Sequence, residues 1–256
     1  MNRARGASPG ETDPLSRPAG RDIAIVHSSD VHVDDGYTAR VHGGDGARGL
    51  KCVLDTAGAL SADVVLLAGD VFEHNRLPDS LLERSAGLLA DCGIPVVMLP
   101  GNHDPLTADS IYRRCGMGEA DNVHILGLTH DRAVRFPELD LEVWGIAHRD
   151  YGNMAPLGSA RPRTTRWQIA MAHGHYEGAE ETGAAHRPSW IVSDAEIAAT
   201  GADYVALGHW NRPVRVGNGA VPAWYSGSPD LAKTVNRVQL TADGTVTVTR
   251  EKIVWD

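Results

Sequence analysis

The chain has 256 residues, of which 42% are hydrophobic and 22% are charged, and its formal net charge is −9. This length and composition can bury a large core, and we expect one sizeable α/β domain over residues 22–256. The longest apolar runs, VVLLAG and PVVMLP, are far shorter than the roughly 20 residues that cross a bilayer, which excludes a membrane-spanning helix. The acidic balance weighs against tight, sequence-independent binding to long duplex DNA, because that binding depends on clustered Lys and Arg.

Residues 1–21 are rich in Arg, Pro, Gly and Ser but contain no apolar segment of the kind found in secretion signals. We expect them to form a disordered tail or to be a cloning remnant, and we exclude them from the fold.

Three cysteines, Cys52, Cys92 and Cys115, are an odd number without CxxC spacing, which fits a reducing compartment better than a disulfide framework. These features predict a cytoplasmic location.

Strands and helices alternate in the first part of the chain. Apolar runs predict buried strands at 22–30, 63–70 and 94–101, and helical spacing of apolar residues predicts helices at 47–62 and 79–93. The second helix has Asp79 or Ser80 as its expected capping residue and ends at Gly93. This βαβαβ order predicts a largely parallel sheet with crossover helices.

Shorter elements are predicted in the second part of the chain. A short helix is expected near 107–115, brief strands at 122–126, 133–137 and 141–147, and buried strands at 167–175 and 203–209. The final segments alternate polar and apolar residues around the turn ADGT, residues 242–245, which predicts an antiparallel hairpin. We therefore expect two sheets that pack face to face and are flanked by helices.

Polar side chains follow the predicted strands where the apolar runs stop. They are Asp30 and His32, then Asp70, then Asn102, His103 and Asp104, then His173 and His175, and finally His209 and Asn211. The carboxyl ends of parallel strands meet at one edge of a sheet, and ligands bind in the crevice there. We therefore expect these side chains to meet, with LPGNHDP at residues 99–105 as one corner of a shared polar cluster.

The predicted cluster combines carboxylates, imidazoles and amides. Carboxylates packed together repel one another, so a cation is expected between them. A mixed set of nitrogen and oxygen ligands suits Mn²⁺, Fe, Zn²⁺ or Mg²⁺ better than a thiolate site would. About seven candidate ligands exceed the roughly four to six that one ion takes, so we expect two divalent ions that share a bridging carboxylate.

Each of these residues has an ordinary alternative when it is taken singly. A lone Asp such as Asp70 is more often a turn or helix cap, and a lone His is more often a satisfied polar residue than a ligand. The joint pattern over several strand ends favours the metal cluster. His173 stands directly at the end of its strand and is preferred as a ligand over His175, which could instead line the substrate. His74, in the loop after Asp70, is expected to approach the substrate.

The blocks SSDVH, AGDVFE, PGNHD, AHGH and LGHWN, in this order, resemble the metallophosphoesterase (calcineurin-like) superfamily. Within it, DYVALGHWNRPVRV followed by WYSGSPD is similar to the Mre11/SbcD group of DNA repair nucleases. The resemblance covers the chain from about Ile23 to its end. It implies a four-layer α/β/β/α sandwich, in which two mixed sheets pack together and are flanked by helices.

The resemblance also implies a set of metal ligands. Asp30 and His32 would bind the first ion, Asp70 would bridge, and Asn102, His173 and His209 would bind the second ion. Asn211 takes the place of the histidine that normally completes the first site. Because an amide oxygen is a weaker donor than imidazole, the first site should bind its ion less tightly or favour Mn²⁺ or Mg²⁺ over Zn²⁺.

These positions imply hydrolysis of a phosphate ester with Mn²⁺ as the preferred ion. His103 would stand beside the substrate and stabilise charge or protonate the leaving alkoxide, and we expect the neighbouring Asp104 to orient its imidazole. The preferred activity is that of a phosphodiesterase or nuclease acting on a small nucleotide, a short nucleic-acid end or another organic phosphate. A phosphomonoesterase and a metal-binding module without turnover remain open alternatives.

The substrate is less well defined by the sequence. Nucleases of the resembled group generally carry a capping domain and a C-terminal segment that docks a partner, and this chain ends at Asp256, so we expect a compact enzyme. The long loop at residues 174–190 is expected to form a wall or lid over the site. The oligomeric state is left open, with a homodimer as one alternative.

Overall fold

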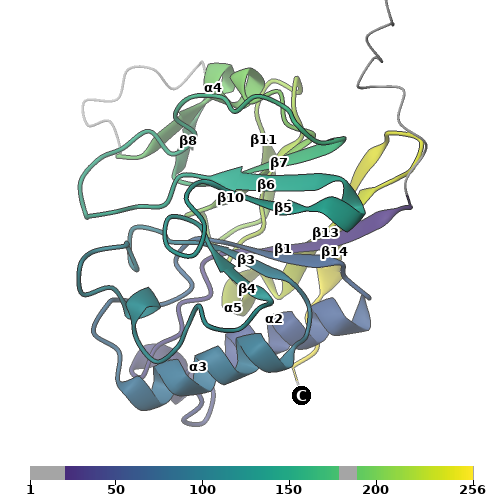
Figure 1. The fold of residues 1–256 in the computed structure, drawn as a ribbon. Coiled ribbons are helices and arrows are strands. Elements are labelled where there is room, and N and C mark those ends of the chain that lie inside the picture. The colour runs from purple at the N-terminus through teal and green to yellow at the C-terminus, as the bar shows by residue number, and fades with distance from the viewer. Residues whose placement is uncertain (1–20, 179–188, 256) are drawn as a thin grey trace, which may run out of the picture.

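Two six-stranded sheets lie one above the other in the computed structural model, which describes residues 21–178 and 189–255 (Figure 1). The first sheet contains, in spatial order, β14 (Val246–Lys252), β13 (Thr234–Leu240), β1 (Ile23–Ser28), β2 (Val64–Ala68), β3 (Val96–Leu99) and β4 (Val123–Ile125). The second contains β11 (Val214–Val216), β12 (Ala223–Tyr225), β10 (Tyr204–Gly208), β7 (Trp167–His173), β6 (Leu141–Gly145) and β5 (Ala133–Phe136). Both sheets mix parallel and antiparallel pairs.

Helices flank the two sheets, as the sequence predicts. They are α1 (Tyr37–Val41), α2 (Arg48–Ala59), α3 (Asp79–Asp91), α4 (Asp194–Ala199) and α5 (Pro229–Ala232), with short 3₁₀ turns at Ile111–Arg113 and Pro137–Leu139. Figure 1 shows α2 and α3 side by side under the first sheet and α4 above the second. A separate parallel pair, β8 (His175–Glu177) and β9 (Ile191–Ser193), was not predicted. The expected α/β architecture of two packed sheets with flanking helices is confirmed.

The first three strands form the predicted βαβαβ unit. β1, β2 and β3 pair in parallel, and α2 and α3 provide the two crossovers. The capping prediction for α3 is wrong. The residue before its first turn is Pro78, whose side chain caps no backbone N–H, and the Asp79 carboxylate pairs with Arg114 instead. The predicted C-terminal hairpin is confirmed by the antiparallel register of β13 with β14, from Thr234 opposite Lys252 to Leu240 opposite Val246.

The second sheet is buried on both faces. Along β7, Ile169 and Met171 join the core between the two sheets, whereas Ala170 and Ala172 join a separate core that includes Ile197 of α4. Such two-sided burial explains why β7 reads as a continuous apolar run instead of an alternating one. Fully burying a Leu or Ile side chain stabilises a fold by about 1.5–3 kcal/mol, so these two cores hold the sheet firmly in place.

Parallel pairing directs several strand ends to one edge of the molecule. β1, β2 and β3 end together in the first sheet, and β7 and β10 end together in the second, where Gly208 lies opposite His173. The residues that follow these strands are those singled out in the sequence.

Within the described ranges, no helix is long and apolar enough to span a membrane. The predicted tail at residues 1–21 falls almost wholly outside the described residues.

Candidate metal centre

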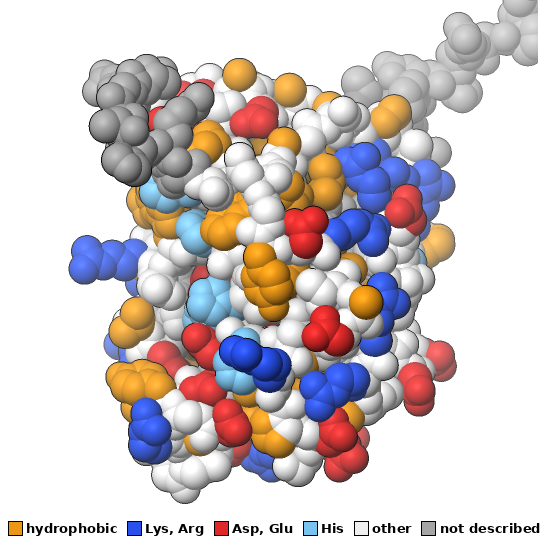
Figure 2. All heavy atoms as spheres, turned by 90° about the vertical axis from the view of Figure 1, so that its left-hand side faces the viewer, with side chains coloured by type: hydrophobic (Ala, Val, Ile, Leu, Met, Phe, Trp, Pro, Cys, Tyr) orange, Lys and Arg blue, Asp and Glu red, His pale blue; other side chains and the backbone are white. Residues whose placement is uncertain are grey.

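The loops after β1, β2, β3, β7 and β10 bring the predicted polar residues together. Figure 2 looks onto this side of the molecule and shows histidine side chains gathered on one face, with acidic, basic and hydrophobic side chains around them. The residues of this cluster that approach one another most closely are Asp30, His32, Asp70, Asn102, His173 and His209. Residues from both sheets contribute, so the face-to-face packing of the sheets creates the site.

One half of the cluster is deeply buried around His173. Its Nε2 lies 3.0 Å from Asp70 Oδ2 and 3.1 Å from Asn102 Oδ1. The same Asn102 oxygen lies 3.2 Å from His209 Nδ1. Ligand atoms of Asp70, His173 and His209 all lie within 4.8 Å of one another, so a single metal ion could contact all three.

The oxygens around His173 suit a cation at this position. Its Nδ1 lies 2.9 Å from the Ala68 carbonyl, which only accepts, so Nδ1 carries a proton and Nε2 faces the Asp70 and Asn102 oxygens. Burial lowers the pKa of His173, but the charges of Asp70 and Asp30 outweigh it and raise the pKa to about 9. In the metal-free protein a proton on Nε2 therefore supplies positive charge between these oxygens. A divalent ion that replaced this proton would find the Nε2 lone pair together with the oxygens of Asp70 and Asn102.

His209 differs from His173 in its charge. Burial and the positive charge of His173 lower the pKa of His209 to about 4, so its imidazole is neutral and retains a lone pair. Neutral imidazole is the form that binds metals. His173 therefore marks a buried position that suits a cation, and His209 offers a neutral imidazole that can bind a metal ion. Both lie in one ligand group with Asp70.

The other half of the cluster is formed by Asp30, His32 and Asp70, whose ligand atoms also lie within 4.8 Å of one another. Asp70 belongs to both halves. Asp30 is held by the backbone N–H of His209 at 3.0 Å and 3.1 Å from its two oxygens and by the Ser29 hydroxyl at 2.6 Å. Burial raises the pKa of Asp30, whereas the positive His173 outweighs burial at Asp70 and holds its pKa below the usual range.

The backbone at these positions is strained. Asp30, His32 and Asp70 have φ values of 52°, 50° and 50°, and His209 has a φ of 108°. Positive φ is uncommon for residues other than glycine and tends to occur at functional sites, where the surrounding fold holds it. Here the segment after β1 pairs with the segment after β2, since Asp30 N–H donates to Gly69 O at 3.0 Å and His32 N–H donates to Asp70 O at 3.1 Å.

Gly69 allows the close approach of the two sheets at the cluster. A Cβ at this position would lie 2.0 Å from His173 Nδ1, and the residue has a φ of +87°. Both the space and the backbone conformation therefore require glycine in the AGD segment. The glycine lets β2 and β7 bring Asp70 and His173 into contact.

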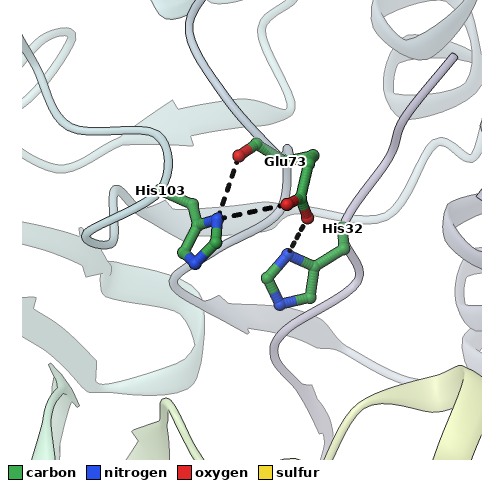
Figure 3. Close-up of side chains that lie close together, drawn as sticks. All are labelled: His32, Glu73 and His103. Carbon is green, nitrogen blue, oxygen red and sulfur yellow. Dashed lines mark hydrogen bonds and ion pairs between the residues drawn. The ribbon is translucent and has the colours of Figure 1, made fainter. Parts of the chain in front are cut away.

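Glu73 is a site residue that the sequence reasoning missed. Figure 3 shows its carboxylate between two imidazoles, with Oε2 2.7 Å from His32 Nδ1 and Oε1 3.5 Å from His103 Nδ1. The Glu73 backbone carbonyl also lies 3.0 Å from His103 Nδ1. The backbone places it there, because Glu73 N–H donates to Val33 O at 3.0 Å and continues the pairing of the two loops. Glu73 is the last residue of the AGDVFE motif, so its place in that motif is the sequence feature that could have identified it as a site residue.

Asp104 does not occupy the position beside the His103 ring that the sequence reasoning gave it. Its side chain is fully buried, and its oxygens accept from the Gly101 N–H at 2.7 Å, the Phe72 N–H at 3.0 Å and the Tyr112 hydroxyl at 2.7 Å. Burial and the nearby Asp70 charge raise the pKa of Asp104 to about 6. These contacts tie the GNHD turn to the loop after β2, and the carboxylate beside His103 is that of Glu73.

The remaining predicted residues lie at or beyond the rim of the cluster. His175 is half-buried, its Nδ1 accepts from the Trp210 indole at 3.1 Å, and its ring centre lies 6.2 Å from that of His209. His74 lines a cavity beside the cluster. Asn211 is exposed two residues beyond His209. The structure therefore brings His173, and not His175, into contact with Asp70 and Asn102.

An open cavity of about 620 Å³ leads to the cluster. Its lining residues are Glu73, His74, Asn75, Arg76, Asn102, His103, Asp109, Tyr151 and Trp190. This volume lies within the range of pockets that hold small organic ligands. A molecule in the cavity would therefore contact Asn102 and His103 directly.

Two ligand groups that share one buried carboxylate, at the edge of two packed α/β sheets, are an arrangement that suits two-metal hydrolases, metal-dependent phosphoesterases among them. The model of the calcineurin-like phosphoesterases matches residues 23–213, and the chain belongs to this family. The family resemblance of the sequence motifs is thereby confirmed. Divalent metals are typical of the family, and the Asp and His groups described above are its candidate ligands here.

Curated relatives match most of the chain at modest identity. The uncharacterized metallophosphoesterase YhaO of Bacillus subtilis (strain 168) is 27% identical over 206 residues, covering 73% of this chain and 48% of that protein. SbcD of the SbcCD nuclease, from the same organism, is 25% identical over 244 residues, covering 81% and 61%. The DNA double-strand break repair protein Mre11 of Aeropyrum pernix is 28% identical over 238 residues, covering 82% and 54%. The chain thus spans roughly half of the length of these relatives.

Solved structures share the same fold. TT1561 of Thermus thermophilus aligns with a TM-score of 0.54 at 12% identity, covering 89% of this chain and 98% of that chain. At this identity the likeness concerns the fold alone. The comparison agrees with the two packed sheets seen here.

Proposed function

We propose that this chain is a phosphodiesterase that uses two divalent ions, with Mn²⁺ preferred, to hydrolyse a nucleotide or a short nucleic-acid end. The observation that carries this proposal is the sharing of Asp70 by two groups of metal-ligand side chains, with His103 beside them. Membership of the family supports phosphoester chemistry, and the relatives named as nuclease and repair proteins favour a diester.

The proposed ligands divide between the two ions. Asp30, His32 and Asp70 would hold the first ion, and Asp70, Asn102, His173 and His209 would hold the second, with Asn211 as a further oxygen donor for the first. Ions bound there would lower the pKa of a water molecule and neutralise charge on the phosphoryl oxygens. The strained backbone and the buried hydrogen bonds to Asp30 keep these side chains in position before any ligand arrives.

His103 is the proposed general acid. Because the Glu73 carbonyl only accepts, its contact with Nδ1 requires a proton on Nδ1, which leaves Nε2 for the substrate. The Glu73 carboxylate, 3.5 Å from Nδ1, would balance the positive charge of a ring that also carries a proton on Nε2. From Nε2 that proton can pass to the leaving alkoxide. We therefore assign to Glu73 the orienting role that the sequence suggested for Asp104, and we assign to Asp104 the support of the GNHD turn.

Small substrates fit the charge of the site better than long nucleic acids do. The net charge of the chain is −9, and the cavity lining contains Arg76 together with the acidic Glu73 and Asp109. Tight binding along a phosphate backbone uses several Lys and Arg contacts. A substrate with one or two phosphates needs only the metal centre and a single nearby cation.

Hydrolysis of paired model esters tests this function. The metal-depleted protein is assayed with bis-p-nitrophenyl phosphate and with p-nitrophenyl phosphate, before and after addition of Mn²⁺. We expect Mn²⁺-dependent hydrolysis with a higher kcat/KM for the diester. His103→Ala should lower kcat by about 10²- to 10⁴-fold, the usual contribution of a general acid. His130→Ala, at a histidine outside both ligand groups, is the matched control.

Two results would change the assignment. A higher kcat/KM for the monoester would identify a phosphomonoesterase on the same scaffold. Failure to hydrolyse either ester, in a protein that binds Mn²⁺, would favour a metal-binding module without turnover.

A further inference from the structure

Two aromatic side chains line the cavity that leads to the proposed metal centre. Tyr151 and Trp190 line it together with Asn102 and His103. Tyr151 is 62% exposed, so much of its surface is free to contact a ligand. A phosphoryl group held at Asn102 and His103 would leave these two aromatic side chains free for another part of the substrate.

Trp190 is fixed in position although it comes from a loop. Its indole N–H donates to Gly152 O at 2.9 Å, and its backbone N–H donates to Asn153 Oδ1 at 2.7 Å. Its ring centre lies 5.4 Å from that of His148 and 5.9 Å from that of His209. These contacts join Trp190 to the loop that carries Tyr151, and they set Trp190 beside His209, a proposed metal ligand.

The arrangement of Tyr151 and Trp190 suits a ligand that contains a flat ring. Aromatic side chains bind planar groups by stacking, and a ring held in advance loses little conformational freedom on binding. The cavity of about 620 Å³ has room for a sugar and a base in addition to a phosphate. Stacking accepts any base, because every base has a π face.

We propose that Tyr151 and Trp190 form a stacking subsite for one nucleobase of the substrate, attached through its sugar to the phosphate at the metal centre. This inference rests on the proposed function and names the chemical group that the site selects. The subsite recognises a single base next to the phosphate, and Tyr151 acts through its ring and not through its hydroxyl.

A comparison of two inhibitors measures the contribution of the base. Thymidine 5′-monophosphate and 2-deoxyribose 5-phosphate carry the same phosphate and sugar, and only the first has a base. Inhibition constants are measured against Mn²⁺-dependent hydrolysis of bis-p-nitrophenyl phosphate. We expect the nucleotide to bind roughly ten- to a hundredfold more tightly, as is typical for stacking of one base.

Variants at the exposed tyrosine separate the ring from the hydroxyl. Tyr151→Ala should reduce the ratio of the two inhibition constants at least threefold, and Tyr151→Phe should preserve it. Folding should tolerate both changes because the side chain is 62% exposed. Tyr37→Ala is the matched control, since Tyr37 is 72% exposed and is not among the residues that line the cavity.

Equal inhibition constants in the unmodified protein would overturn the inference, as would a ratio that Tyr151→Ala leaves unchanged. If bis-p-nitrophenyl phosphate is not hydrolysed, the proposed function fails, and calorimetric titration of the same two ligands into the Mn²⁺-loaded protein still tests the subsite. A tighter, Tyr151-dependent binding of the nucleotide would then support a binding subsite without catalysis.

Discussion

Substitution of Gly69 by alanine probes the contact between the two sheets at the proposed metal centre. The added methyl group would lie 2.0 Å from His173 Nδ1 and 2.4 Å from its Cγ, at a residue with a φ of +87°. The His173 side chain is completely buried, so other parts of the protein surround it. The ring must therefore shift away from the Ala68 carbonyl, 2.9 Å from Nδ1, and from Asp70, 3.0 Å from Nε2.

The expected cost combines backbone strain with lost polar contacts. A residue other than glycine in a sparsely populated region of positive φ costs about 1–3 kcal/mol. A buried hydrogen-bonding group that loses its partner costs about 1–3 kcal/mol more. We therefore expect Gly69→Ala to lower the free energy of unfolding of the metal-free protein by about 4 kcal/mol. At about 2–4 °C per kcal/mol, the thermal midpoint should fall by roughly 8–16 °C.

Calorimetry of the metal-depleted protein measures this shift, and titration with Mn²⁺ measures the accompanying loss of affinity at the His173 side of the centre. Gly87→Ala is the control. Gly87 lies exposed within α3 with no atom within 4 Å of an added Cβ, so alanine should stabilise the helix by about 0.5–1 kcal/mol. A midpoint within about 2 °C of the unmodified protein for Gly69→Ala, with unchanged Mn²⁺ affinity, would refute the described packing of the two sheets.

Three further substitutions test individual residues. Glu73→Gln should lower kcat for bis-p-nitrophenyl phosphate about 10- to 100-fold. The thermal midpoint should change little, because the Glu73 side chain is 38% exposed. An unaltered kcat would remove Glu73 from the proposed mechanism. Asp104→Ala leaves three hydrogen-bond donors without their buried acceptor. It should lower the free energy of unfolding, measured by urea titration, by about 3 kcal/mol. An unchanged urea midpoint would contradict the structural role of Asp104. Asn211→His should tighten Mn²⁺ binding at the first site about tenfold by calorimetric titration, and unchanged affinity and stoichiometry would count against its assignment as a ligand.

The βαβαβ start of the fold and most ligand-type residues could be read from the sequence because each depends on local pattern. The apolar run before Asp70, for example, predicts β2, and parallel pairing then places the end of that strand beside the ends of β1 and β3. The preference for His173 over His175 followed from its place directly at the end of β7. In the structure, His173 contacts Asp70 and Asn102, while His175 is bound to Trp210.

The partners of the GNHD turn could not be read in the same way. Asp104 follows His103 in the chain, and adjacency suggested that the carboxylate orients the imidazole. In the structure the two side chains diverge, and Asp104 accepts from groups in other segments, such as Phe72 and Tyr112. The imidazole of His103 lies instead beside Glu73, which is 30 residues away in sequence.

By itself, the sequence determined most strands of the two large sheets and the side chains that stand at their ends, because periodicity and turn residues act over short distances. It did not indicate the pair β8 and β9. Tertiary structure alone decided that Glu73 lies between His32 and His103, and that Tyr151 and Trp190 line the same cavity. These contacts depend on how loops from different strands pack after the sheets have come together. Side-chain direction and packing between distant segments leave no periodic pattern in the sequence, so only the folded chain reveals them.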